Sequence, residues 1–259
     1  MTRALVTGAG KRLGRAMALE LARQGFDVAV HYASSADAAE AVAAEIRDMG
    51  RHAVTLQADL LDEDQVTPLV GRAVTALGGP LTTLVNNASI FEYDTIETAT
   101  RTHWDRHMES NLRAPFVLTQ ALAEQVPAPE IDAMGEPVAQ GLVVNMIDQR
   151  VRKLTPDFMT YTIAKMGLWA FTQTSAQALA PRLRVNAIGP GPTLQGQRQT
   201  AQHFARQRDA TILRRGANED DITGALIYLL RAPGVTGQLI CVDGGQHLAW
   251  QTPDVLGVD

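Results

Sequence analysis

The chain has 259 residues, of which 46% are hydrophobic and 20% charged, a balance typical of a soluble globular protein with a sizeable core. Its formal net charge of -5 gives no electrostatic reason to expect nucleic acid or an anionic membrane as a partner. The single cysteine, Cys241, excludes an intramolecular disulfide and fits a reducing compartment. The first residues run directly into a strand-like segment, and no apolar run reaches the roughly 18 residues of a membrane span. We therefore expect a cytoplasmic protein.

Short apolar runs alternate with longer amphipathic segments along the chain, which is the pattern of βαβ units around a buried parallel sheet. The predicted strands cover residues 4–7, 27–32, 53–57, 81–86, 142–146, 184–188 and 239–242. The predicted helices cover residues 13–24, 36–49, 64–77, 103–125, 159–180 and 219–230. Because these elements account for nearly the whole chain, the sequence predicts one α/β domain over residues 1–259.

Two irregular regions interrupt this pattern. Residues 127–141 contain several prolines, and we interpret them as a plain surface loop before the fifth strand. Residues 189–208 follow the sixth strand and begin with turn residues. Since ligands bind beside the carboxyl ends of the strands in such sheets, we expect a substrate loop here that extends to about residue 215.

A glycine-rich turn, Thr7-Gly-Ala-Gly-Lys-Arg-Leu-Gly14, separates the first predicted strand from the first predicted helix. Glycines let the backbone approach a pyrophosphate, and the helix N-terminus offers unpaired N–H groups. A chain selecting NAD carries Asp or Glu about 20 residues further on, to bind the ribose 2′-hydroxyl. Here the second strand ends in Val30-His-Tyr-Ala-Ser-Ser35, without a carboxylate until Asp37, while Lys11 and Arg12 put two cations beside the position of a 2′-phosphate. The sequence therefore predicts a site for NADP(H).

Tyr161 and Lys165 are four positions apart in a predicted helix, so their side chains share one face about 6 Å apart along the axis. An unperturbed tyrosine has a pKa of roughly 10, and a nearby cation lowers it by about 1 to 3 units. We therefore expect Lys165 to lower the pKa of Tyr161. Such a phenol could deliver a proton near neutral pH.

In combination and order, these features resemble the short-chain dehydrogenase/reductase family over essentially the full chain. The matching motifs are the glycine-rich turn, Asn86-Asn-Ala-Ser89 after the fourth strand, Asn111 in a helix, the pair Tyr161 and Lys165, and the turn Pro190-Gly191. The resemblance implies a Rossmann-like, doubly wound, seven-stranded parallel sheet and a homotetramer. It also implies Tyr161 as proton donor, Lys165 bound to the nicotinamide ribose, and Asn111 holding a water in a proton relay.

The predicted cofactor contacts follow the ends of the strands. Asp59 and Leu60 come after the third strand, where an adenine edge could be met. The full predicted cofactor-binding set is Gly8, Lys11, Arg12, Leu13, Gly14, His31, Tyr32, Ser34, Asp59, Leu60, Asn87, Ala88, Ser89, Tyr161, Lys165, Pro190 and Gly191.

The sequence departs from the usual family pattern at two positions. Arg12 stands where many members have a third glycine, and Asp148 stands thirteen residues before Tyr161, where the family has a catalytic serine. Both departures occur together in the pteridine reductase branch, and the chain also resembles bacterial dihydromonapterin and dihydrofolate reductases of the same fold. In that branch an aromatic residue stacks on the pterin ring, a role that the resemblance gives to Phe91, with Ser89 close by.

The chemistry of Asp148 points the same way. A serine hydroxyl can donate to a ketone oxygen that becomes an alkoxide, whereas an ionised carboxylate only accepts hydrogen bonds and repels that charge. A carboxylate suits a substrate rich in N–H donors, in which a C=N carbon takes the hydride and its nitrogen takes a proton. A reduced pterin ring is such a substrate.

We therefore expect an NADPH-dependent reductase that converts a dihydropterin or dihydrofolate to its tetrahydro form. The predicted catalytic residues are Asn111, Asp148, Tyr161 and Lys165, and the predicted substrate contacts are Ser89, Phe91, Asp148 and Tyr161. Two alternatives stay open. One is a carbonyl or 3-oxoacyl reductase of the same family that tolerates Asp148. The other is a non-catalytic NADP(H)-binding sensor, which would need no proton donor.

The segment after the last strand contains Asp243-Gly-Gly245, which resembles the common ending of the family and is expected to be a turn against a neighbouring subunit. We interpret His247 and Trp250 as structural residues, although both could reach a partner's active site. The histidines and acidic residues show no helical metal-ligand spacing, so the sequence predicts no metal.

Overall fold

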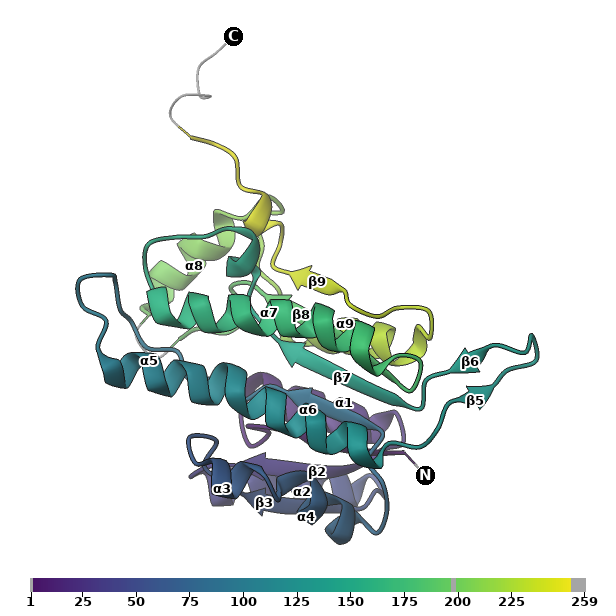
Figure 1. The fold of residues 1–259 in the computed structure, drawn as a ribbon. Helices are drawn as coiled ribbons and strands as arrows, with labels where there is room; N and C mark the ends of the chain where they lie inside the picture. Colours follow the sequence, from purple (N-terminus) through teal and green to yellow (C-terminus); the bar gives the residue numbers. More distant parts are fainter. Residues whose placement is uncertain (1, 197–198, 253–259) are drawn as a thin grey trace.

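The seven predicted strands form one parallel sheet in the computed structural model, which describes residues 2–196 and 199–252 (Figure 1). Across the sheet the strands are β3 (Ala53–Gln57), β2 (Asp27–Tyr32), β1 (Arg3–Val6), β4 (Thr83–Asn86), β7 (Gly141–Met146), β8 (Leu183–Pro190) and β9 (Leu239–Val242). The order reverses between β1 and β4. In a doubly wound sheet, the crevice at this reversal, beside the carboxyl ends of the strands, is where ligands bind.

Helices cover both faces of the sheet because successive strand residues point to opposite sides. On β1, Ala4 and Val6 belong to one buried apolar cluster, whereas Leu5 belongs to the other. The first cluster includes α1 (Arg12–Arg23), α2 (Ala36–Asp48) and α9 (Glu219–Arg231). The second includes α4 (Leu69–Leu77), α6 (Ala114–Gln125) and α7 (Met159–Leu179). The predicted doubly wound α/β domain is confirmed.

Two of the predicted helices are divided. Residues 64–77 form α3 (Glu63–Val66) and α4, because Pro68 between them has no N–H for the helical ladder. Residues 103–125 form α5 (Arg101–Met108), a π-helical segment (Glu109–Arg113) and α6. The π-helical segment contains Asn111, and such turns inside α-helices are frequent at functional sites.

Residues 127–141 are not the plain loop expected from the sequence. Strands β5 (Glu130–Ile131) and β6 (Pro137–Val138) pair in antiparallel fashion, and the hairpin projects away from the sheet between α6 and β7 (Figure 1). Asp132 Oδ1 accepts hydrogen bonds from the backbone N–H groups of Met134 at 2.8 Å and Glu136 at 2.9 Å. Because the turn depends on these local bonds, hydrophobic periodicity does not reveal it.

The predicted substrate loop has more regular structure than expected. Strand β8 continues to Pro190, beyond its predicted end, and α8 (Ala201–Asp209) lies inside the loop. Short 3₁₀ turns cover Gln149–Arg152 and Gln246–Leu248.

Among the described residues, none of the helices has the length and apolar character that crossing a membrane requires.

Candidate active site

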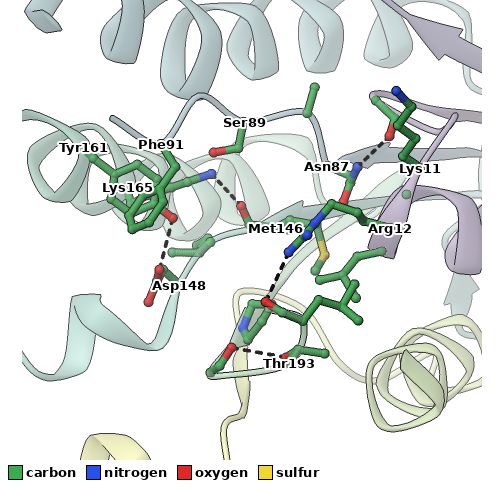
Figure 2. Close-up of a pocket in the computed structure, with 18 residues that line it drawn as sticks. Lys11, Arg12, Asn87, Ser89, Phe91, Met146, Asp148, Tyr161, Lys165 and Thr193 are labelled. Carbon is green, nitrogen blue, oxygen red and sulfur yellow. Dashed lines mark hydrogen bonds between the residues drawn. The ribbon is translucent and has the colours of Figure 1, made fainter. Parts of the chain in front are cut away.

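A cavity of about 510 Å³ opens at the carboxyl ends of β1, β4, β7 and β8 (Figure 2). Its lining residues are Gly8, Lys11, Arg12, Leu13, Gly14, Asn87, Ala88, Ser89, Phe91, Met146, Ile147, Asp148, Tyr161, Lys165, Pro190, Gly191, Thr193 and Leu194. Most of the predicted site residues are therefore brought together. Met146, Ile147, Thr193 and Leu194 are absent from the predicted set of site residues, although Thr193 and Leu194 fall in the predicted substrate loop. Their position at the ends of β7 and β8 is the signal that could have included all four.

The glycine-rich turn leaves no room for a side chain where Gly14 approaches Gly8 and Asn87. Gly8 has φ +62°, in the left-handed region that favours glycine. A Cβ on Gly14 would lie 2.2 Å from the Gly8 carbonyl oxygen and 2.5 Å from Asn87 Nδ2. The first turn of α1 can therefore lie against β1 and β4 only with glycine at this position, which leaves a backbone-lined cradle at the helix N-terminus.

His31 is hydrogen-bonded to the backbone of this turn. The Gly8 N–H donates to His31 Nδ1 at 3.0 Å, so the ring carries its proton on Nε2, which donates to the Ala58 carbonyl at 3.0 Å. Burial lowers the pKa of His31 to about 4. The neutral ring is thus a buried support of the turn and does not line the cavity, although the sequence prediction includes it among the cofactor contacts.

The two cations of the turn point to different parts of the molecule. Lys11 lines the main cavity and also a second one of about 340 Å³, which residues 34–38 line with it at the start of α2. Arg12 donates instead to the backbone carbonyls of Leu194, at 3.2 Å, and Gln195, at 3.0 Å. Only Lys11 therefore lies at the second cavity, and Arg12 ties the turn to the segment after β8.

Thr7 and Asn87 join the ends of β1 and β4. Thr7 Oγ1 accepts from the Asn87 N–H at 2.9 Å and from the Ala88 N–H at 3.0 Å. Asn87 Nδ2 donates back to the carbonyls of Thr7, at 2.8 Å, and Gly8, at 3.2 Å. These reciprocal bonds fix the two strand ends that form the floor of the cavity.

Tyr161, Lys165 and Asp148 meet at the opposite end of the cavity (Figure 2). The Tyr161 hydroxyl donates to Asp148 Oδ2 at 3.1 Å, and the Arg150 N–H donates to Asp148 Oδ1 at 2.8 Å. Lys165 is 1% exposed, and its Nζ donates to the Met146 carbonyl at 2.8 Å. The carboxyl group of Asp148 is therefore turned toward the phenol, not toward bulk water.

The expected lowering of the Tyr161 pKa by Lys165 is wrong. Burial raises the pKa of Tyr161 well above its ordinary value, and the charge of Asp148 and its hydrogen bond raise it further. Burial also raises the pKa of Asp148 and lowers that of Lys165 to about 8. The spacing of Tyr161 and Lys165 correctly puts both in the site, but the phenol responds mainly to burial and to the carboxyl group that it contacts.

Asn111 holds the segment that carries Phe91. Its Oδ1 accepts from the Ile90 N–H at 2.9 Å, and its Nδ2 donates to the Ile90 carbonyl at 2.9 Å. The residue is fully buried and does not line the cavity. Its amide group thus acts on the backbone directly before Phe91.

Phe91 lies in a cluster of rings at the cavity wall. Its ring stacks on Phe158 with centroids 4.2 Å apart and planes at 9°, and it meets Tyr161 edge-on at 4.7 Å. Tyr93 meets Phe158 edge-on at 5.2 Å. Phe158 is absent from the sequence prediction, although its position three residues before Tyr161 could have drawn attention to it.

The remaining predicted residues lie further out. Ser34 lines the second cavity, whereas Tyr32, Asp59 and Leu60 line neither of the two. Asp243 accepts from His247 Nδ1 at 2.7 Å within the turn after β9, and Trp250 is exposed. Within the described part of the chain, no group of three or more His, Cys, Asp or Glu side chains could hold a metal ion.

The fold and this site define a dinucleotide-binding protein of the Rossmann-like class. A sequence model of the short chain dehydrogenase family matches residues 2–205, so the chain belongs to that family. Among characterised sequences, it is 30% identical to 3-oxoacyl-[acyl-carrier-protein] reductase FabG of Staphylococcus epidermidis, over 95% of this chain and 98% of the relative.

Solved structures show a similar relationship. The crystal structure of FolM alternative dihydrofolate reductase 1 from Brucella canis, complexed with NADP, has a TM-score of 0.90 and 43% identity, and the match covers 98% of this chain and 97% of that one. The FolM structure from Brucella suis, also with NADP, has a TM-score of 0.90 and 44% identity, with 98% of each chain covered. The landomycin C-6 ketoreductase LanV with NADP and rabelomycin is more distant, with a TM-score of 0.83, 30% identity and coverage of 96% and 97%.

Proposed function

We propose that this protein reduces a dihydropterin or dihydrofolate at a C=N bond, with NADPH as the reductant. The observation behind this proposal is the carboxyl group of Asp148, which lines the same cavity as Phe91 and accepts the hydrogen bond of the Tyr161 hydroxyl. An aromatic wall and an acceptor side chain suit a flat ring with N–H groups. The likeness to the two FolM structures supports the same substrate class.

The chain is an NADP-dependent oxidoreductase of the short-chain family. We propose that the pyrophosphate lies in the backbone cradle at the N-terminus of α1, which the close approach of Gly14 to Gly8 makes possible, and that Lys11 binds the 2′-phosphate in the second cavity. When bound, NADPH supplies the hydride. Lys165 would hold the nicotinamide ribose at the end of the cavity that also contains Tyr161 and Asp148.

Side chains of the protein would supply the proton that the substrate nitrogen takes up. Tyr161 would protonate the ring nitrogen and the phenolate left behind would take up a proton from bulk water, while Asp148, which accepts the hydrogen bond of the hydroxyl, would hold the phenol in place. Because burial raises the pKa values of both groups, each holds its proton to a higher pH than in water. The two titrate as a pair, since each ionisation changes the other.

A carbonyl reduction is the second candidate, and the FabG relatives favour it. In such a reaction a donor group must stabilise the developing alkoxide, which an ionised Asp148 cannot do. We therefore keep 3-oxoacyl reduction as the alternative that the experiment has to separate.

The test compares wild-type protein with Asp148→Ser in an NADPH-oxidation screen. The substrates are 7,8-dihydrobiopterin, dihydromonapterin and dihydrofolate, with acetoacetyl-CoA as the carbonyl control. We expect wild-type turnover of at least one pteridine, and in Asp148→Ser a loss on pteridines with a gain on the carbonyl compound. Turnover of acetoacetyl-CoA alone by the wild-type protein would assign the chain to the carbonyl reductases.

We also propose that residues 189–215 form the substrate loop and that the cytoplasmic protein is a homotetramer. Trp104 on α5 and Ile163 and Met166 on α7 are each about two-fifths exposed, and α5 packs beside α7. Apolar side chains on adjacent helices suit contact between subunits. Light scattering measures the mass of the purified protein in solution. A monomeric mass would contradict the homotetramer.

A further inference from the structure

Phe158, the residue directly before α7, has a backbone conformation that aromatic residues rarely adopt. Its φ of +57° and ψ of +49° lie in the left-handed region, where a Cβ crowds the following carbonyl. Glycine or asparagine would suit this backbone better. A bulky ring held against the local preference of the chain often marks a functional site.

Asp94 holds this conformation in place. Its backbone carbonyl accepts from the N–H groups of Phe158, at 2.8 Å, and Met159, at 3.3 Å. Its fully buried carboxyl group accepts from the Thr160 N–H at 3.2 Å and from the Thr160 hydroxyl. Asp94 therefore acts as an N-cap for α7 from a distant part of the chain, while the N-cap residue Phe158 makes no side-chain cap bond.

His107 completes the same network. The Glu92 N–H donates to His107 Nε2 at 3.1 Å, so Nδ1 carries the ring proton and donates to Thr160 Oγ1 at 2.7 Å. The segment from Glu92 to Asp94 is thus bonded to the start of α7 at several points. Because Tyr161 follows Thr160 directly, the network also fixes the residue that carries the phenol.

The position held in this way brings the Phe158 ring against Phe91. The two planes are within 9° of each other, and Tyr93 meets the Phe158 ring edge-on while its hydroxyl donates to Asp157 Oδ1 at 3.0 Å. The guanidinium of Arg150 lies 5.1 Å from the centre of the Phe158 ring. Phe91 lines the cavity, but Phe158 does not. Phe158 therefore supports Phe91 from outside the cavity.

We propose that Phe158 is a positioning residue that determines specificity, because it sets the plane of the Phe91 ring so that the site selects flat, bicyclic substrates. This inference rests on the proposed function, in which the substrate stacks on Phe91. A ring on Phe91 that could turn freely would present its edge as often as its face, and offset stacking needs the face. The strained backbone at Phe158 is then a consequence of bringing a second ring behind the first.

The test uses four variants with distinct expectations. Phe158→Gly removes the ring and suits the left-handed backbone, whereas Phe158→Ala removes the ring and keeps the backbone strain. Phe158→Tyr keeps a flat ring, and Phe158→Leu keeps apolar volume without one. The readouts are KM and kcat with 7,8-dihydrobiopterin, the Kd for NADPH, the thermal midpoint, and the orientation of Phe91 in a crystal structure of Phe158→Gly with NADP+.

We expect KM for the pteridine to rise about tenfold in the Gly, Ala and Leu variants, the scale of one lost aromatic pair, and to stay near wild type in Phe158→Tyr. kcat should change less than KM, and the Kd for NADPH should not change. Phe158→Gly should have a higher thermal midpoint than Phe158→Ala, and Phe91 should change its ring orientation. Stability and substrate affinity would then respond separately to the backbone and to the ring.

Either of two results overturns the proposal: an unchanged Phe91 orientation in Phe158→Gly, or a KM in Phe158→Leu equal to that of Phe158→Tyr. A wild-type protein that binds NADPH but reduces none of the pteridines rejects the proposed function instead. In that case the orientation of Phe91 in Phe158→Gly still decides the positioning role, since that measurement needs no substrate.

Discussion

The Tyr161 hydroxyl donates a hydrogen bond to Asp148 Oδ2 at 3.1 Å, so the phenol of the site is paired with an acid rather than with a neutral alcohol. Both side chains line the same cavity, and burial raises the pKa of each. In contrast, the Lys165 ammonium donates to the Met146 carbonyl. The pKa of Tyr161 therefore depends mainly on burial and on Asp148.

The first prediction concerns that proton. Tyr161→Phe removes the hydroxyl while the ring keeps its packing against Phe91, so NADPH should bind normally. We expect kcat on a dihydropterin to fall by about 10² to 10⁴, the usual scale for a general acid. Steady-state kinetics and a fluorescence titration with NADPH check the two statements. Turnover near the wild-type value would remove Tyr161 from the proton transfer.

The second prediction concerns the cradle of the glycine-rich turn. In Gly14→Ala the new Cβ would lie 2.2 Å from the Gly8 carbonyl oxygen, which belongs to the backbone and cannot move aside. We expect the free energy of unfolding to fall by roughly 1 to 3 kcal/mol and NADPH to bind at least about tenfold more weakly. Urea unfolding and NADPH titration measure both.

Gly71→Ala is the matched control for this change. Gly71 lies in α4, and a Cβ there would meet nothing within 4 Å. Alanine in a helix interior should raise the free energy of unfolding by about 0.5 to 1 kcal/mol and leave NADPH binding unchanged. Equal losses in the two variants would show that the turn around Gly14 is less crowded than its contacts indicate.

The third prediction concerns pH and His31. Its pKa is about 4 in the folded protein, because of burial, against 6.5 ordinarily, so between these values the unfolded chain binds a proton that the folded chain does not. The stabilisation that depends on a neutral His31 is complete above pH 6.5 and is lost as the pH falls, and the loss reaches about 3 kcal/mol at pH 4. Chemical unfolding at several pH values measures this slope.

His31→Gln should flatten that slope between pH 6.5 and 4, since glutamine does not titrate there. The exposed His52, replaced by Gln in the same way, serves as the control and should keep the wild-type slope. NADPH affinity should follow the same dependence, because a protonated ring at position 31 can no longer accept the Gly8 N–H. A wild-type slope in His31→Gln contradicts the assignment.

The sheet and the main cavity could be predicted from the sequence because each depends on local patterns. Apolar runs identified the buried strands, and in a parallel sheet the carboxyl ends of neighbouring strands must lie together. The turn at Gly8 and the pair of Tyr161 and Lys165 therefore meet at one edge of the sheet. The spacing of these residues along the sequence was therefore sufficient to predict that they share one site.

The electrostatics and the supporting network could not be predicted in this way. The pKa of Tyr161 depends on burial and on Asp148, whereas the helical spacing indicated only the nearby lysine. The hydrogen bond between Asp94 and Thr160 joins positions 66 residues apart. The positive φ of Phe158 is a conformation that aromatic residues rarely adopt. Such features arise from tertiary contacts that override local preference, so no periodicity reports them.

The last prediction concerns the contact between the glycine-rich turn and the substrate loop. Arg12 has φ +53°, so Arg12→Gly suits the backbone while it removes the guanidinium that bonds Leu194 and Gln195. We expect the Kd for NADPH to rise about tenfold, the equivalent of one charged hydrogen bond, and the segment after β8 to be cleaved faster by protease. Arg15→Ala is the control, because Arg15 pairs with Glu45 away from the cavity. If Arg12→Gly resists protease as well as the wild-type protein does, Arg12 does not hold the loop.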